Sequence, residues 1–188
     1  MKKLMLSGLL LASTLFVYAQ KTDSTSTNGG INGNNELKLN LFYTIAGFPE
    51  INYERILKDD MSVGVAILVG LEKDSEYSFG IIPNFRVYFG NKKASGFFIE
   101  GNAAVISYKD NYYDYSYLAY SSYPAGTYQY TSPIAKTYTN FGLGAAAGGK
   151  FLTKKGFVGE IYLGVGRLFG DSPIEAYPRG GITIGKRF

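Results

Sequence analysis

The feature that most constrains this chain is a hydrophobic pattern with a period of two residues, which recurs from residue 36 almost to the end. Residues 61–71, MSVGVAILVGL, show it clearly, because large apolar residues alternate there with small ones. Successive side chains of a β-strand point to opposite faces, so such a segment gathers its large apolar residues on one face. About eight segments of roughly 9–13 residues follow this pattern, with no convincing amphipathic helix between them. The sequence therefore predicts an all-β fold of antiparallel strands.

The lengths of these strands and the character of their two faces indicate a barrel that crosses a membrane. A soluble sandwich has strands of about 5–6 residues, whereas a tilted strand needs about 9–11 residues to cross a bilayer. The mean hydropathy of -0.04 is too polar for a bundle of membrane helices. The face opposite the apolar one carries charges and glycines. We therefore expect residues 36–188 to form an antiparallel up-and-down transmembrane β-barrel of about eight strands.

The amino-acid composition excludes several classes of functional site. The chain contains no Cys and no His, so it has no disulfide, no thiolate or imidazole metal site and no Ser-His-Asp triad. Its formal net charge of +4 is spread along the chain, whereas a nucleic-acid-binding protein gathers its positive charge in one patch. We accordingly expect no metal, no cofactor and no nucleic-acid partner.

The first 19 residues have the layout of a secretory signal peptide. Lys2 and Lys3 precede an apolar stretch that runs from Leu4 to Val17, and Ala19 supplies a small residue before the expected cleavage point. An uncleaved membrane anchor, the alternative, needs about 20 apolar residues and finds fewer here. Residues 20–35 are rich in Ser, Thr, Asn and Gly, so we interpret them as a flexible leader that precedes the barrel.

The C-terminal segment RGGITIGKRF, together with the strand pattern over residues 36–188, resembles the small outer-membrane β-barrel proteins of Gram-negative bacteria, which have the eight-stranded architecture of the OmpA type. Ile182, Ile184 and Phe188 share one face there and resemble the terminal signal that the barrel-assembly machinery reads. The resemblance implies insertion into the cell outer membrane by that machinery and contact with its lipid. The segment LNLFYTIAGFPEINYERIL also resembles a family of such barrels that brings no established activity.

The lengths of the connections predict how such a barrel is oriented. Short connections at 58–60, 90–96 and 153–156 alternate along the chain with outer ones that include the two longest, 109–136 and 170–178. A chain that starts on the periplasmic side places the two longest connections outside the cell, as this architecture predicts. If the connection 109–136 contributed two further strands, the barrel would have ten strands instead of eight.

Charged residues on the inward face predict a blocked lumen. Three basic and three acidic residues fall on that face: Lys38, Glu54, Arg86, Glu100, Lys150 and Glu160. In a lumen as narrow as eight strands allow, opposite charges should pair and fill the interior. The alternatives are a narrow pore or channel for small solutes and, third, a soluble ligand-binding barrel, whose lumen would be apolar. Barrels that act on lipid A or on peptides rely on a catalytic His, which this chain lacks, so we expect no enzymatic activity. We also expect the protein to be a monomer.

A hairpin rich in Tyr, residues 109–136, is the most distinctive surface feature. The stretch from Tyr108 to Tyr138 holds ten of the seventeen Tyr. Five of them alternate along its two arms: Tyr113, Tyr115, Tyr117, Tyr128 and Tyr130. Tyr combines a rigid ring with a polar group and suits contact with an extracellular protein or glycan, although some of these rings would also fit an aromatic girdle at the membrane boundary. We therefore expect an outer-membrane barrel with a structural or surface-interaction role.

Overall fold

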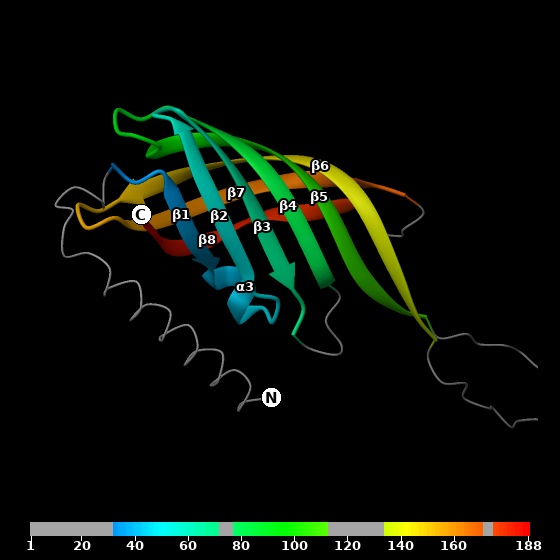
Figure 1. The fold of residues 1–188 in the computed structure, drawn as a ribbon. Coiled ribbons are helices and arrows are strands. Elements are labelled where there is room, and N and C mark those ends of the chain that lie inside the picture. Colours follow the sequence, from blue (N-terminus) through cyan, green and yellow to red (C-terminus); the bar gives the residue numbers. More distant parts are fainter. Residues whose placement is uncertain (1–31, 72–76, 113–133, 171–174) are drawn as a thin grey trace, which may run out of the picture.

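The computed structural model describes residues 32–71, 77–112, 134–170 and 175–188. Over these residues the chain forms a closed barrel of eight antiparallel strands that follow one another in chain order (Figure 1). The strands are β1 (Asn35–Asn40), β2 (Glu50–Lys58), β3 (Met61–Val69), β4 (Tyr77–Tyr88), β5 (Gly96–Tyr112), β6 (Ile134–Leu152), β7 (Phe157–Phe169) and β8 (Ala176–Arg187). The prediction of an all-β up-and-down barrel is thus confirmed.

The described residues form eight strands rather than ten, because residues 109–112 and 134–136 of the predicted hairpin belong to β5 and β6. These two strands pair without a shift in register from Gly96 with Lys150 to Tyr112 with Ile134. They are 17 and 19 residues long and run on past the ends of the other strands (Figure 1). The pairing therefore lengthens two strands of the barrel and adds none.

Inward and outward residues alternate along each strand as the period of two predicts. In β2, for example, Glu50, Asn52 and Glu54 are buried, while Ile51 and Tyr53 are exposed. The alternation follows from the pleat of the strand, which sends successive side chains to opposite sides of the barrel wall. What is unusual is the polarity of the two sides, since the buried side holds the charges.

The described residues include a helix that we did not predict. The alternating pattern favours a strand through Ile45, but β1 ends at Asn40 and is followed by a short helix, α3 (Leu41–Ile45). The Asn40 side chain caps this helix by accepting a hydrogen bond from the Tyr43 N–H at 3.4 Å. As a result β1 has only six residues. Among the described residues, no helix is long and apolar enough to cross a membrane.

The turn between β4 and β5 closes one end of the barrel, which we call the base. Ala94 in this turn is fully buried, and its N–H donates to the Asp59 carbonyl at 2.6 Å. Arg187, at the end of β8, donates to the carbonyls of Lys93 and Ala94 at 2.9 and 2.8 Å. Hydrogen bonds between two turns and the end of β8, which are distant in sequence, thus hold the base together.

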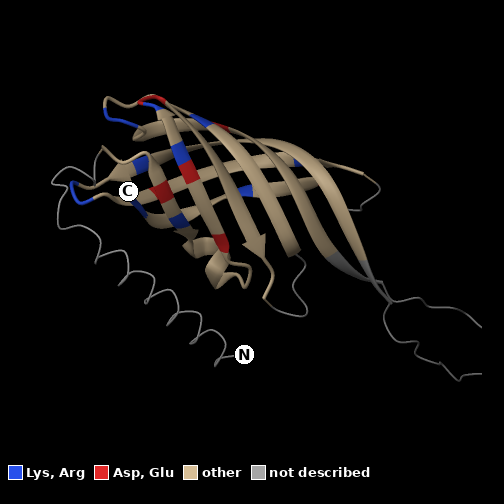
Figure 2. Ribbon diagram, viewed as in Figure 1, with Lys and Arg blue, Asp and Glu red and all other residues tan. Residues whose placement is uncertain are grey.

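Two apolar clusters lie inside the barrel. The one nearer the base contains Ile56, Tyr88, Ala94, Phe98, Ala146 and Tyr162. The other contains Ala66, Ile82, Ala104, Ile106, Leu168 and Tyr177. Figure 2 shows that the charged positions on the strands gather in the half of the barrel that ends at the C-terminus.

Candidate functional site

The described part of the barrel interior contains ten charged side chains that are 1% exposed or less. They are Glu36, Glu50, Glu54, Glu100, Glu160, Lys38, Lys150, Arg86, Arg179 and Arg187. Five are acidic and five are basic, so the set is formally neutral. We call this set the interior charge network.

Glu54 and Glu160 form the centre of the network, where they share three cations. Lys38 pairs with Glu54, and its Nζ lies 2.7 Å from Glu160 Oε1. Arg86 Nη1 lies 3.0 Å from Glu54 Oε2 and 3.0 Å from Glu160 Oε1. Lys150 Nζ lies 2.7 Å from Glu54 Oε1 and 3.2 Å from Glu160 Oε1. Four strands, β1, β2, β4 and β6, are joined to β7 in this way.

Two branches extend the network along the barrel. Toward the base, Glu36 accepts from Lys150 at 2.8 Å and from the Arg187 Nε at 2.7 Å. Away from the base, Glu100 accepts from the Nε of Arg86 at 2.7 Å and of Arg179 at 2.8 Å. The second branch ends at Glu50, 2.8 Å from Arg179 Nη1. Its members come from strands on all sides of the barrel, so the network spans the lumen.

Neutral groups satisfy much of the remaining hydrogen-bonding capacity. The Tyr88 hydroxyl donates to Glu54 at 2.6 Å and the Tyr162 hydroxyl to Glu50 at 3.0 Å. The Thr183 hydroxyl donates to Glu160 at 3.1 Å. The Arg86 guanidinium also lies 4.5 Å from the centre of the Phe98 ring, which adds a cation–π contact.

Burial on this scale requires that the charges be paired. An unpaired ion inside a protein costs several kcal/mol, and ion pairs offset that cost only when further hydrogen bonds complete their geometry. Here every acidic member has at least one basic partner within 3.0 Å. The arrangement explains how charged side chains can occupy a water-poor interior.

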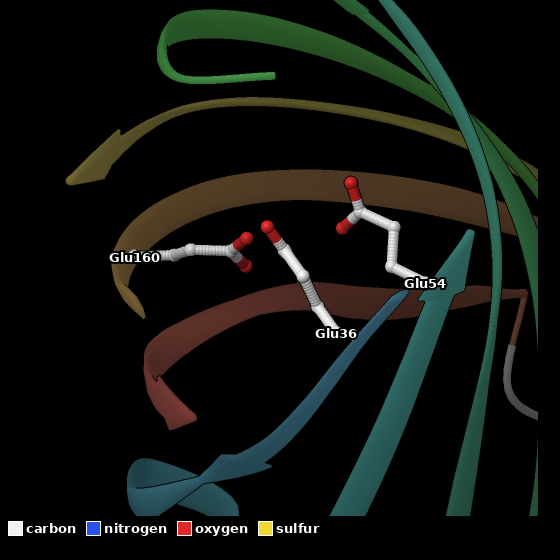
Figure 3. A group of neighbouring side chains, drawn as sticks. All are labelled: Glu36, Glu54 and Glu160. Atoms are coloured by element: carbon white, nitrogen blue, oxygen red, sulfur yellow. The ribbon is translucent and has the colours of Figure 1, made fainter. Parts of the chain in front are cut away.

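Three carboxylates of the network, those of Glu36, Glu54 and Glu160, approach closely enough to suggest a metal site. One oxygen of each lies within 4.8 Å of the others, and Figure 3 shows the three side chains pointing toward one another. However, Lys38, Lys150 and Arg86 already bond to oxygens of these three carboxylates. The charge that would attract a cation is therefore balanced by side chains of the chain itself.

The structure places all six lumen residues named from the sequence in this network. Sequence reasoning missed four others, which are Glu36, Glu50, Arg179 and Arg187. Each stands at or near the end of a strand, where a charge is readily assigned to a solvated turn. The period of two could have found them, because Arg179 and Arg187 are in phase with buried Thr183 and out of phase with exposed Ile182.

The other predicted residues fall into two groups. Ile182, Ile184 and Phe188 are on the outer face, each exposed by half or more. The five Tyr of the hairpin arms, Tyr113, Tyr115, Tyr117, Tyr128 and Tyr130, lie outside the described residues, as do residues 1–19 and most of 20–35.

The outer face of the barrel is apolar, whereas the inner face carries the charges. Large apolar side chains from six of the eight strands, all but β3 and β4, are between 48 and 79% exposed there: Leu37, Ile51, Phe97, Ile99, Leu143, Phe157, Ile161, Leu163, Val165, Ile182, Ile184 and, next to the end of β8, Phe188. A soluble monomer seldom exposes a contiguous apolar surface of more than a few hundred Å². The barrel thus has the reverse polarity of a soluble protein.

Comparison with known proteins identifies the fold. No protein-family model matches the sequence, and no curated protein matches it. Among solved structures, the N-terminal β-barrel domain of OprF from Pseudomonas aeruginosa is similar, with a TM-score of 0.50 and 13% sequence identity. The match covers 83% of this chain and 98% of that domain. The likeness shows that the chain has the fold of an eight-stranded barrel of the OmpA type.

Proposed function

We propose that the protein is a β-barrel of the bacterial outer membrane, with a structural or surface-interaction role and no enzymatic activity. One observation carries this proposal, namely the apolar outer face around a charged interior. A belt of exposed Leu, Ile, Val and Phe is unfavourable in water by roughly 25 cal/mol per Å², whereas hydrocarbon solvates it without that cost. A closed barrel also satisfies its backbone hydrogen bonds between strands, as a membrane-spanning sheet must.

The interior supports a blocked lumen rather than an open pore. The interior charge network links β1, β2, β4, β5, β6, β7 and β8 across the barrel, and the turn that contains Ala94 closes the base. We propose that the network stabilises the barrel and prevents passage of solutes. Planar-bilayer recordings test this, since the narrow-pore alternative requires conductance steps and a blocked lumen gives none.

The surface-interaction role is proposed for the hairpin carried by β5 and β6. The described parts of these strands extend beyond the other strands, and they lead directly into the Tyr-rich residues. A rigid two-stranded arm would hold Tyr side chains away from the membrane, where an extracellular protein or glycan could contact them. We also propose that the protein is a monomer and that the barrel-assembly machinery inserts it into the membrane.

Cell fractionation followed by gel electrophoresis tests the membrane assignment. Closed membrane barrels resist SDS until heated, so we expect a band in the outer-membrane fraction whose mobility changes on boiling. The same sample treated with urea before loading, without heat, serves as a control for unfolding. A protein found in the soluble fraction with unchanged mobility would contradict the proposal.

A further inference from the structure

The barrel wall has a gap in its hydrogen bonding between β1 and β8. Because β1 ends at Asn40, its pairing with β8 stops at Thr183. The preceding part of β8, residues 176–182, pairs with β7 alone. Pro178 lies in this part of β8, and a proline, which has no N–H to donate, is typical of a strand edge. We call this region the β8 seam.

Helix α3 occupies the place of the missing half of β1 and only partly closes the seam. The Tyr43 hydroxyl donates to the Pro178 carbonyl at 2.9 Å, and the Asn40 side chain donates to the Gly180 carbonyl at 3.1 Å. Two side-chain hydrogen bonds thus replace a regular ladder.

A cavity of about 560 Å³ lies at the seam. Its lining includes the inward-facing residues Leu68, Ile82 and Ile106, and also Ile161 and Leu163, which face outward. Residues of both faces can border one cavity only where the wall is open. The cavity therefore runs from the interior, past the edge of β8, to the apolar outer surface.

The lining offers a ligand almost nothing but apolar surface. Tyr43, Tyr162 and Tyr177 line the cavity, but the hydroxyl of each donates to a protein atom. Arg179, the one charged residue of the described lining, is fully buried and pairs with Glu50 and Glu100. Apolar cavities of this kind hold no stable water and bind apolar molecules, and the volume is within the usual range of ligand pockets, about 300–1,000 Å³.

From this geometry we propose that the cavity binds a hydrocarbon chain, which enters sideways from the surrounding bilayer through the β8 seam. The inference rests on the proposed membrane location, because only then does the seam open onto lipid. The chemistry recognised is an unbranched alkyl chain, supplied either by a membrane lipid or by a free fatty acid. The interior charge network forms the floor that stops the chain from passing further toward the base.

Photolabelling in nanodiscs tests the proposal. The barrel is reconstituted in dimyristoyl phosphatidylcholine that contains a small fraction of a phosphatidylcholine with a diazirine at the end of one acyl chain. A parallel sample contains a 16-carbon fatty acid with the same diazirine. After irradiation, mass spectrometry locates the labels. We expect labels on the inward-facing residues Leu68, Ile82 and Ile106 with at least one of the two probes, and the probe that labels them identifies the source of the chain.

Outward-facing neighbours on the same strands distinguish the proposed membrane location from the proposed binding site, because they report contact with the bilayer. These neighbours are Ile67, Ile81 and Val105. Labels on these outward residues without any on the inward ones would overturn the binding site and leave the membrane assignment intact. Labels on neither set would overturn both proposals.

A matched pair of variants tests whether the cavity itself takes the chain. Gly80 lines the cavity, and a Cβ there would lie 3.6 Å from Leu68 and 3.7 Å from Ile106, which are ordinary contacts. The substitution Gly80→Leu should therefore fill the cavity and lower inward labelling about tenfold, because each buried methylene contributes severalfold to affinity. Gly101→Leu, on the open outer face, should change it little. Ile82→Phe is the second filling variant if Gly80→Leu does not fold, and undiminished inward labelling in a folded filled variant would overturn the proposal.

Discussion

At the scale of single residues, Arg86 pairs with three of the five acidic members of the interior charge network. Its guanidinium bonds to Glu54, Glu100 and Glu160 and stacks on Phe98. Without Arg86 the buried network would hold five acidic and four basic side chains, and a buried charge that is not compensated costs more than an ion pair itself contributes. The stability of the barrel should therefore depend strongly on this residue.

We predict that Arg86→Met lowers the free energy of unfolding by about 3–5 kcal/mol, the usual cost of breaking a buried ion pair. Urea unfolding in lipid vesicles measures the change. The matched control is Arg167→Met, because Arg167 is on the exposed face of β7, and it should alter stability by no more than about 0.5 kcal/mol. Equal effects of the two substitutions would contradict the role given to the network.

Close packing of Tyr177 on glycines is a second feature at this scale. The ring lies over Gly166, its cross-strand partner, where a Cβ would overlap the ring atoms. The Tyr177 hydroxyl bonds to Asn102 at 2.5 Å, which fixes the ring in place. Only a glycine fits beneath a ring held in this way.

The substitution Gly166→Ala should accordingly destabilise the barrel by about 1–3 kcal/mol, the typical cost of overpacking. Gly101→Ala, where a Cβ would meet nothing within 4 Å, is the control for the loss of a glycine. Combining Gly166→Ala with Tyr177→Leu should recover part of the loss, as a thermodynamic cycle of the four proteins would show. Strictly additive effects would argue against contact between the two positions.

At the scale of elements, the exchange of half a strand for helix α3 distinguishes this barrel from a regular one. Asn40 has several partners there, since its side chain caps the helix, donates to Gly180 across the seam and also donates to Glu50 and Tyr162. Loss of these interactions should loosen the seam without opening the rest of the barrel, where β8 remains paired on both sides.

Hydrogen exchange of the Asn40→Ala variant should show this local loosening. We expect faster exchange for amides in residues 176–182 and unchanged exchange for those in 183–187, because local opening depends on local hydrogen bonding. Asn35→Ala is the control, since Asn35 is in the same strand but bonds to Tyr53 and Arg55 on the exposed face. A uniform increase over β8 would show that the seam is not a separate unit.

The long strands β5 and β6 lead to a prediction about the hairpin. Tyr112 pairs directly with Ile134, so a two-residue Asn-Gly turn could join them in place of residues 113–133. We expect this shortened protein to keep its heat-dependent gel mobility and to lose binding to any extracellular partner. Loss of the folded barrel would instead assign the hairpin a structural role.

The strands and several interior residues could be predicted from the sequence, whereas helix α3 and the β8 seam could not. The physical reasons differ. The period of two locates the strands. It also assigns Lys38, Glu54 and Arg86 to the interior, because each occupies the alternate positions that carry the other polar residues of its strand. It could not detect helix α3, because Leu41, Tyr43 and Ile45 suit a strand equally well and the Asn40 cap depends on a three-dimensional contact. Ion-pair partners and the seam depend on register between strands, which no local pattern contains.

At the scale of the whole molecule, the central claim is that the polarity of the barrel is reversed relative to a soluble protein because lipid surrounds it. The ten buried charges balance one another within the described interior, so the inside is a stable polar core. The apolar outside is favourable in a solvent of low polarity. The proposed cavity is compatible with this view, since its seam opens onto the same surroundings.

The most direct test of that claim is a nitroxide scan along β7 in lipid vesicles. The chain contains no Cys, so single cysteines at Ile161, Leu163 and Val165, and at Thr153 as a turn control, can be labelled without background. Collision with oxygen reports lipid, and collision with a water-soluble nickel complex reports water. The account predicts that the three strand positions collide mainly with oxygen and the turn position with nickel. Strong nickel collision at Ile161, Leu163 and Val165 would contradict it.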